Sequence, residues 1–135
     1  MIKADVKLAE TLNIRPDDKV WHVKRVRFIK QKPVNLEETW MPLAMFADLT
    51  WEVMENSKYH YIEQIKKMVI DRSEQELVPI MPSQEAIDAL ALDPAKPILE
   101  KVSRGFLKDG RVFEYSRNVF NSDDYKFTLV AKRRH

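Results

Sequence analysis

The stretch at residues 20–42, VWHVKRVRFIKQKPVNLEETWMP, predicts a β-hairpin that carries charges where alternation calls for apolar side chains. Successive side chains of a strand point to opposite faces of a sheet, so Arg25 and Arg27 share a face with large apolar residues. The expected face of the first arm contains Trp21, Val23, Arg25, Arg27 and Ile29, and one face of the second arm contains Asn35, Glu37 and Thr39. Glu37 and the two arginines can therefore line one pocket.

Two interpretations of the arginine pair fit this pattern. Arginine lays its aliphatic stem along apolar surface and keeps its charge in water, so the pair can be a solvated face or can form cross-strand ion pairs with Glu37 or Glu38. Alternatively, Arg25 and Arg27 present planar, permanently charged donors to a phosphate or a carboxylate. The alternation alone does not choose between them.

The composition indicates one globular domain and excludes several classes of function. Of the 135 residues, 44% are apolar and 33% are charged. The sequence has no cysteine, which excludes disulfides and thiolate chemistry, and its net charge of +2 does not favour nucleic-acid binding by this domain. No apolar run approaches the ~20 residues that cross a bilayer, and the first residues lack the apolar core of a signal peptide. We therefore expect a cytoplasmic protein without membrane contact.

Hydrophobic periodicity and turn residues predict short helices between antiparallel strands. Residues 43–56 suggest one or two helical turns, Ser57 begins a longer helix, and Pro82 and Ser83 begin another. The predicted helices are 6–12, 57–67 and 84–92; the extended segments are the hairpin 20–42, with its turn at 30–32, and 69–81, 98–107, 112–120 and 125–132. This order predicts an α+β domain, a mostly antiparallel β-sheet flanked by short helices.

Two further features are candidates for a binding site. Ser57 is a candidate N-cap, and the free N–H groups of a helix start attract anions, although a plain capped helix is the simpler interpretation. Glu114 is a carboxylate on a strand, and the expected face around it contains Val112, Glu114, Ser116, Asn118 and Phe120. This face is either exposed or lines the same cavity as Arg25, Arg27 and Glu37.

The order of these features resembles the UTRA domain, the effector-binding domain of the HutC subgroup of GntR-family bacterial transcriptional regulators. The resemblance covers residues 19–132 and rests on RVR at 25–27, PVNLEETWMP at 33–42, Ser57 with Tyr59, LALDPAKPIL at 90–99, the Asp-Gly turn at 109–110, and EYSRNVFNSDDYKF at 114–127. It implies a chorismate-lyase-like fold that binds a small metabolite, often a sugar phosphate, and that dimerises. In such regulators a separate winged helix-turn-helix domain binds DNA.

The resemblance implies an anion site. Arg25 and Arg27 match arginines that hold a phosphate or another anion in relatives with phosphosugar ligands. Ser57 and Tyr59 match positions at a helix start that complete that site, in agreement with the N–H groups expected there.

The resemblance also implies contacts with the rest of the ligand. Glu37 and Glu114 match carboxylates that accept hydrogen bonds from ligand hydroxyls or amines. Phe120 stands where many relatives place a tyrosine, so one polar ligand contact is missing here. Asp124 and Tyr125 match a closing pattern that we interpret as structural.

A domain organisation follows from the same resemblance. Residues 1–18 are expected to be a linker with a short helix, and residues 19–135 the UTRA effector-binding domain. The winged-helix domain is absent from this chain, so DNA contact is expected only through that separate domain. We expect a homodimer, with Trp51, Val53, Met54 or the final strand as candidate contacts. No metal and no cofactor are expected.

Two alternatives to a sensor are an enzyme and a ligand-free dimerisation module. A lyase-like enzyme would use the arginines and glutamates to bind a substrate and move a proton. The sequence offers only His22, His60 and His135, has two glycines and lacks a metal or phosphate-loop motif, so we predict that the protein is not an enzyme. A dimerisation module would require the arginines and Glu37 to be surface charges.

The mechanism expected from these residues is a ligand-operated switch. Closure around the ligand would order residues 43–57 and 121–124. Different ligand affinities of two domain arrangements would then change the spacing of DNA-binding domains in the intact dimer.

Overall fold

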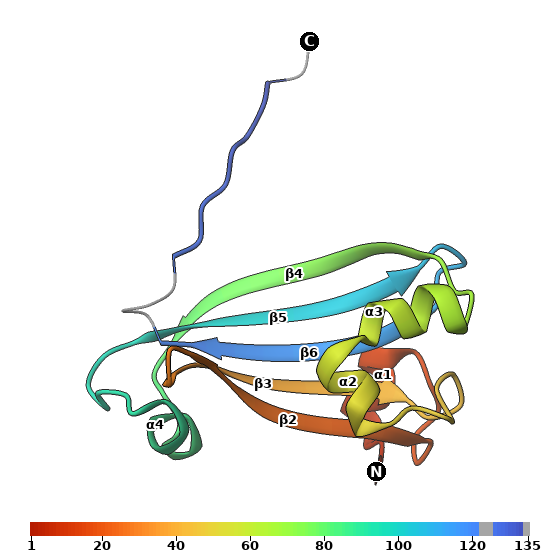
Figure 1. Ribbon diagram of the computed structural model, residues 1–135, viewed down its shortest axis with the longest axis horizontal. Coiled ribbons are helices and arrows are strands. Elements are labelled where there is room, and N and C mark those ends of the chain that lie inside the picture. Colours follow the sequence, from red (N-terminus) through yellow and green to blue (C-terminus); the bar gives the residue numbers. More distant parts are fainter. Residues whose placement is uncertain (122–125, 134–135) are drawn as a thin grey trace.

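Within the residues that the computed structural model describes, 1–121 and 126–133, six antiparallel strands form one sheet with short helices on both faces (Figure 1). The strand order is β1-β2-β3-β6-β5-β4. The strands are β1 Ile2–Lys3, β2 Lys19–Ile29, β3 Lys32–Pro42, β4 Ile70–Ile80, β5 Ile98–Leu107 and β6 Val112–Phe120. The helices are α1 Val6–Leu12, α2 Trp51–Asn56, α3 Lys58–His60, the π-helical η1 Tyr61–Ile65, and α4 Gln84–Leu90. The predicted α+β class is confirmed.

The hairpin of β2 and β3 forms as predicted, with boundaries within one residue. In its register Arg25 lies opposite Glu37. The turn residues Lys30 and Gln31 have left-handed φ values of 49° and 68°. Such values at both central residues let a tight turn match the right-handed twist of the strands.

The two faces of the sheet are covered by different helices. We call the pocket face the one that carries Arg25, Glu37 and Thr39, and α2, α3 and η1 cover one end of it. The opposite back face is covered by α1 at one end and by α4 at the other. The middle of the pocket face therefore lies open beside the helices.

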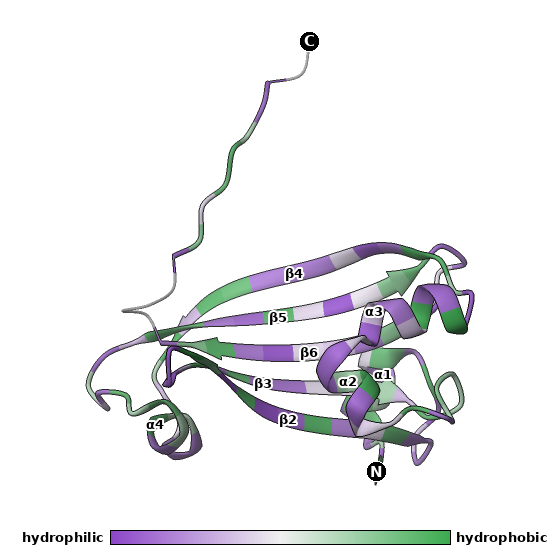
Figure 2. Cartoon of the chain, viewed as in Figure 1, coloured by the Kyte–Doolittle hydropathy of each residue, from purple (hydrophilic) through white to green (hydrophobic). Residues whose placement is uncertain are grey.

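Three groups of buried apolar side chains correspond to these helices. The group under α2 and η1 contains Met41, Phe46, Leu49, Met54, Tyr61, Ile62, Leu107 and Phe113. The group under α1 contains Ala4, Ala9, Leu12, Val20, Phe106 and Val112, and the group under α4 contains Leu36, Ala86, Leu90 and Ile98. Figure 2 shows how apolar and polar segments alternate along the strands between these groups. In the described part of the chain, no helix is long and apolar enough to cross a membrane.

The helices at the two ends of the back face begin where the sequence predicts. The Asp5 carboxylate accepts from the backbone N–H of Leu8 at 2.8 Å and caps α1. The Ser83 hydroxyl accepts from the N–H of Ala86 at 3.2 Å and caps α4. Helix α4 ends at Leu90, two residues earlier than predicted, because Ala91 adopts a left-handed conformation.

The helix predicted over 57–67 forms over 58–65, as α3 and η1, but the prediction that the Ser57 side chain caps it is wrong. The Ser57 side chain makes no capping hydrogen bond, and its backbone N–H donates to the carbonyl of Val53 at 2.9 Å. Ser57 is thus the residue that connects α2 to α3, and its N–H group is already hydrogen-bonded within α2. The helix then widens into the π-helical η1, which buries Tyr61 and Ile62.

The prediction that Val112 shares a face with Glu114 is also wrong. The register between β5 and β6 pairs Gly105 with Glu114 and Phe106 with Val112, so Phe113 is an extra residue in β6. Such a bulge reverses the alternation beyond it. Val112 therefore packs under α1, whereas Glu114 stays on the pocket face.

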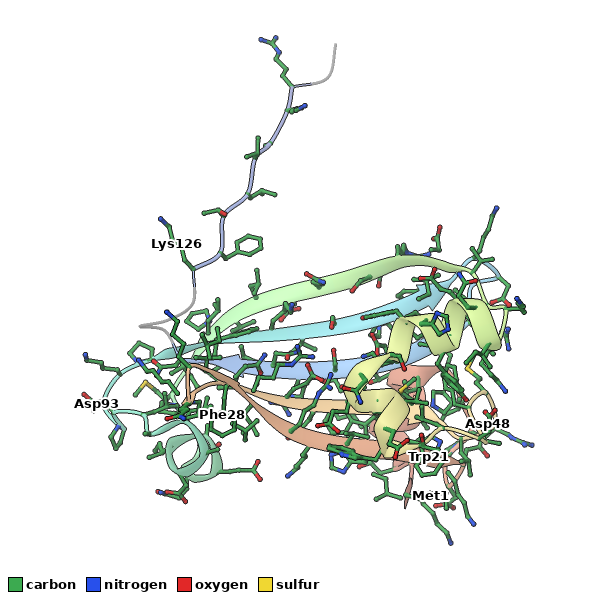
Figure 3. The ribbon with its side chains drawn as sticks, in the orientation of Figure 1. Met1, Trp21, Phe28, Asp48, Asp93 and Lys126 are labelled. Atoms are coloured by element: carbon green, nitrogen blue, oxygen red, sulfur yellow. The ribbon has the colours of Figure 1, made fainter. Side chains whose placement is uncertain are left out.

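The strand predicted at 125–132 does not form in residues 126–132, which have no regular secondary structure. Figure 3 shows Lys126 on a segment that extends away from the sheet. The side chains of Phe127, Leu129 and Val130 are 51%, 77% and 84% exposed. Alternation gives a segment strand propensity, but a strand also needs a neighbouring edge for its N–H and C=O groups. Asp124 and Tyr125 lie outside the described residues.

Gly105 allows two pocket-face side chains to approach β5 closely. A Cβ at this position would lie 2.6 Å from the ring of Phe113 and 3.2 Å from Cγ of Glu114. Phe113 is itself only 2% exposed, so its ring has little room to move. The missing side chain thereby sets the position of both the bulge and Glu114.

We predict that Gly105→Ala lowers the free energy of unfolding by about 1–3 kcal/mol, the usual cost of overpacking a core. The better strand propensity of alanine recovers at most about 1 kcal/mol. Urea denaturation measures the loss, and Glu76→Ala on the exposed face of β4 is the control. A Gly105→Ala protein as stable as this control would contradict the close packing described here.

Candidate functional site

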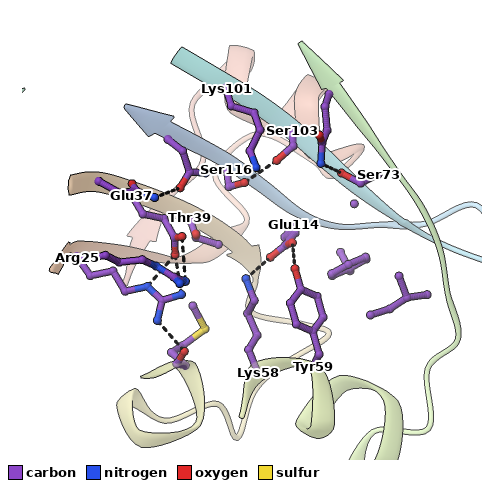
Figure 4. Close-up of a pocket in the computed structure, with 18 of the residues that line it drawn as sticks. Arg25, Glu37, Thr39, Lys58, Tyr59, Ser73, Lys101, Ser103, Glu114 and Ser116 are labelled. Carbon is purple, nitrogen blue, oxygen red and sulfur yellow. Dashed lines mark hydrogen bonds and ion pairs between the residues drawn. The ribbon is translucent and has the colours of Figure 1, made fainter. Parts of the chain in front are cut away.

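A cavity of about 630 Å³ lies between the open part of the pocket face and α2 and α3 (Figure 4). Its floor consists of side chains from five strands, and residues 54–59 form its wall. This volume is within the range of small-molecule sites. All seven residues predicted for a binding site line it: Arg25, Arg27, Glu37, Ser57, Tyr59, Glu114 and Phe120.

A cluster of three charged side chains lies where β2 and β3 meet α2. The Arg25 Nε donates to Oε1 of Glu37 at 2.7 Å, and its Nη1 donates to the carbonyl of Met54 at 3.1 Å. Arg27 approaches the other oxygen of Glu37 at 3.3 Å. The side chains of Arg25 and Glu37 are 15% and 11% exposed, whereas that of Arg27 is 53% exposed. Arg27 therefore has free donor capacity toward the cavity.

A second cluster joins α3 to β6. The Lys58 ammonium contacts Oε2 of Glu114 at 2.8 Å, and the Tyr59 hydroxyl donates to Oε1 at 3.3 Å. Figure 4 shows both side chains reaching from the helix toward the carboxylate. Burial of the hydroxyl, followed by the charge of Glu114, raises the pKa of Tyr59 to about 12. The tyrosine is thus a neutral hydrogen-bond donor at physiological pH.

Neutral polar side chains form the floor between the two clusters. The hydroxyls of Ser103 and Ser116 are 2.7 Å apart, and the amide nitrogen of Asn35 donates to the amide oxygen of Asn118 at 3.2 Å. Strand register places Thr39, Ser116 and Ser103 side by side on three neighbouring strands. The floor is thus a row of small hydrogen-bonding groups.

The remaining predicted residues lie at the edges of the cavity. Phe120 is 8% exposed, and its ring lies 5.8 Å from the ammonium of Lys101. Ser57 lines the wall but offers no free N–H, as described above. The sequence analysis did not single out Lys58 or Lys101 for the site. Lys101 pairs with Asn118, which pairs with Glu37, so its place in the site follows only from the register of three strands.

The arrangement favours binding over proton transfer. Both central carboxylates are held by cations, Glu37 by the arginines and Glu114 by Lys58. Among residues 1–121 and 126–133, no three histidine, aspartate or glutamate side chains gather in a way that could hold a metal ion. Fixed charges and hydroxyls around an open cavity are suited to a polar, hydroxylated ligand.

The chain belongs to the UTRA domain family, whose profile matches residues 1–126. The resemblance found in the sequence is therefore confirmed. UTRA domains of the related regulators are effector-binding domains and not enzymes, in line with the absence of catalytic activity predicted from the sequence.

Among curated proteins, the chain is 69% identical over 134 residues to the mannosyl-D-glycerate transport/metabolism system repressor MngR of Escherichia coli (strain K12). That match covers 99% of this chain and 56% of MngR. The chain is 26% identical to the transcriptional repressor NagR of Bacillus subtilis (strain 168), covering 98% of this chain and 55% of NagR. The chain thus spans about half the length of the curated relatives it matches.

Solved structures agree with the fold. A GntR-family transcriptional regulator from Bacillus cereus has a TM-score of 0.89 and 29% identity, covering 97% of this chain and 92% of that one. The effector-binding domain of the trehalose repressor TreR of B. subtilis has a TM-score of 0.85 and 26% identity, covering 98% and 92%. The fold is thus shared with domains of transcriptional regulators.

The two arginines are predicted to differ in their effect on stability. Arg25→Met leaves the buried Glu37 with one weak partner and breaks the contact with α2, so it is expected to cost about 1–3 kcal/mol of unfolding free energy. Arg27→Met changes a half-exposed side chain and is expected to cost less than about 0.5 kcal/mol. Urea denaturation of both variants measures the difference. Equal losses of unfolding free energy in the two variants would show that the contacts of Arg25 with Glu37 and α2 do not stabilise the fold.

Proposed function

We propose that this chain is the effector-sensing domain of a bacterial transcriptional regulator of the HutC subgroup, and that its effector is a sugar derivative with an acidic group. The family and the regulatory relatives support a sensor. The observation that carries the ligand class is the half-exposed guanidinium of Arg27 above a floor of hydroxyl and amide groups. A planar cation of this kind is a strong partner for phosphate or carboxylate.

The charge of the cavity supports an anion. In the described part of the chain, five cationic side chains line it against three carboxylates: Arg25, Arg27, Lys58, Arg72 and Lys101 against Glu37, Glu55 and Glu114. The excess of positive charge lowers the free energy of a bound anion and attracts it from solution. Phosphate is our preferred group, because the family resemblance implies a sugar phosphate.

The relative MngR supports a sugar with an acidic substituent. Its name refers to mannosyl-D-glycerate, a mannose unit joined to a small carboxylic acid. At 69% identity over 99% of this chain, a ligand of related chemistry is the natural first candidate. We therefore include both mannosyl-D-glycerate and sugar phosphates among the candidate effectors.

We assign the predicted residues to two parts of the ligand. Arg25 and Arg27 bind the anion, with Ser57 and Tyr59 beside them on the wall. Glu37 and Glu114 accept hydrogen bonds from ligand hydroxyls, since a carboxylate has about four acceptor positions and each uses only part of them here. Phe120 supplies an apolar surface for the sugar ring.

The regulatory mechanism that we propose uses the link between the cavity and α2. Arg25 holds the Met54 carbonyl, so a ligand that draws this guanidinium toward its anion also moves the wall formed by residues 54–59. A ligand that binds one position of the wall more tightly than another increases the population of that position, and this changes the arrangement of the domains in the intact regulator. DNA is bound by a separate winged-helix domain in the cytoplasm. Residues 19–135 act as the effector domain, and residues 1–18 pack on its sheet through β1 and α1.

We predict that the wild-type chain is stabilised against heat by sugar phosphates or mannosyl-D-glycerate and not by unmodified mannose, because only a ligand of the folded state raises the melting temperature. Arg27→Ala is expected to weaken the best ligand about 10- to 100-fold in calorimetry, the effect of losing a charged hydrogen bond. Arg15→Ala, at an 89% exposed side chain, is the control.

Unchanged affinity in Arg27→Ala would contradict the anion site. If no sugar derivative stabilises the wild-type chain, the sugar ligand is wrong and the ligand-free dimerisation module becomes the better account. Conversion of an aromatic carboxylate substrate to a new product would favour the lyase-like enzyme.

Homodimerisation is the second part of the proposal. Trp51 is 53% exposed, and exposed apolar side chains also follow one another at Phe127, Leu129 and Val130. Large exposed apolar groups often mark protein contacts. Met54, a candidate contact in the sequence, is 3% exposed in the core and is not available. We therefore propose that the segment 126–132 contacts a second copy of the chain, as an extended segment does when it adds to a sheet edge.

Sedimentation velocity is expected to show a dimer for the full chain and a weaker dimer for a chain that ends at Asn121. A chain that ends at Lys132 is the matched control and should dimerise like the full chain. A monomeric full chain would contradict the dimer, and equal dimerisation of all three would exclude the segment 126–132 from the interface.

A further inference from the structure

Two polar atoms on the floor of the cavity are buried without a hydrogen-bond partner, the amide oxygen of Asn35 and the hydroxyl of Thr39. Asn35 is 8% exposed and Thr39 is 1% exposed, and both line the cavity. They are four residues apart on β3, so their side chains point to the same face. A buried polar atom without a partner destabilises the protein that holds it, and such atoms are rare. Both residues line the cavity, so these atoms lie in its floor.

Lys101 is a second feature of the floor, and the proposed function assigns no group of the ligand to it. It lies on β5, and its ammonium approaches no carboxylate closely enough for an ion pair in the described residues, whereas Lys58 is paired with Glu114. Its nearest recorded partner is the ring of Phe120 at 5.8 Å, the outer limit of a cation–π contact. Arg72, the cation that β4 contributes to the cavity, is already paired with Asp71 and Glu74. Lys101 is therefore an unneutralised, partly buried charge.

The position of Lys101 is opposite the arginines across the floor. Register places Arg25, Glu37, Asn118 and Lys101 in one row over four neighbouring strands. Three strand spacings separate the backbones of the two ends by about 14 Å. The long side chains at both ends shorten this gap to the dimension of one or two small sugar-sized units. Asn35 and Thr39 lie on β3, between the two ends.

We propose that the effector carries two acidic groups, one bound by the arginines and the other by Lys101. The part of the ligand between these groups carries hydroxyls. One hydroxyl donates to the amide oxygen of Asn35, and another exchanges a hydrogen bond with Thr39. A sugar phosphate joined to a small hydroxy acid has this chemistry. This inference rests on the proposed function and adds the number and spacing of the acidic groups.

Calorimetry on the full chain with three probes tests the proposal. The probes are mannose 6-phosphate, mannosyl-D-glycerate, and mannosyl-D-glycerate that carries a phosphate on its mannose unit. The doubly acidic probe is expected to bind at least tenfold more tightly than either probe with one acidic group. Lys101→Met is expected to remove this advantage and to weaken mannose 6-phosphate much less than the doubly acidic probe. Lys96→Met, at an exposed lysine outside the cavity, is the matched control and should bind all probes as the wild type does.

Thr39→Val provides a second, independent readout. Valine has the shape of threonine without the hydroxyl, so it removes the unpaired buried group. The free variant is expected to melt at the same or a higher temperature than the wild type, while its affinity for the doubly acidic probe falls about tenfold. A merely structural threonine would show the opposite pattern, a lower melting temperature with unchanged affinity.

The outcomes separate the inference from the proposed function. If probes with one and two acidic groups bind equally and Lys101→Met changes nothing, the second acidic group is overturned while the sensor of a single anion stands. If none of the three probes binds the wild-type chain, the sugar-derived anion is overturned, and the inference falls with it. Unchanged affinity in Thr39→Val would remove Thr39 from the ligand contacts.

Discussion

The contact on which the cavity depends is the buried ion pair between Arg25 and Glu37. It joins two neighbouring strands through side chains that are 15% and 11% exposed, and the same guanidinium reaches the Met54 carbonyl of α2. One side chain thus ties the floor of the cavity to its wall. Removing one partner of a buried ion pair strongly destabilises the fold, because the remaining charge is left in the protein interior without compensation. The position of α2 over the sheet is therefore sensitive to anything that competes for Arg25.

The middle of the pocket face is polar although the sheet is well packed elsewhere. Three apolar groups under α2, α1 and α4 hold the ends of the sheet, and this leaves the centre for charged and hydroxyl side chains. Local sequence and packing usually agree in a natural fold, and they conflict mainly where function requires it. The pocket face shows three such conflicts. It carries charges at alternating strand positions, it buries the ion-paired carboxylates of Glu37 and Glu114, and it holds buried polar atoms without a partner. Together they support the proposal that this face binds the ligand.

Much of the fold could be predicted from the sequence, because strand alternation and turn residues act locally. The ligand roles of the seven candidate residues were expected from the family resemblance, and all seven line the cavity. The hairpin at 20–42 placed Arg25, Arg27 and Glu37 on the correct face. Features that depend on distant partners could not be predicted: the extra residue Phe113 fits because Gly105 lies opposite, and the Ser57 N–H is used by the preceding helix. The segment 126–132 has the alternation of a strand but no edge to join within this chain's described residues. The position of Lys101 in the cavity could be found only from the pairing register of three strands, β3, β6 and β5.

The central claim is that a ligand binds at the arginine pair on the pocket face, and side-chain NMR tests it most directly. In ¹H–¹⁵N spectra of the arginine Nε–H groups, titration with mannose 6-phosphate or mannosyl-D-glycerate should shift the signals of Arg25 and Arg27 along one saturable curve. The signal of Arg117, which pairs with Glu100 on the back face, should stay in place. Shifts confined to Arg117 and Arg104, or none that saturate, would contradict the account.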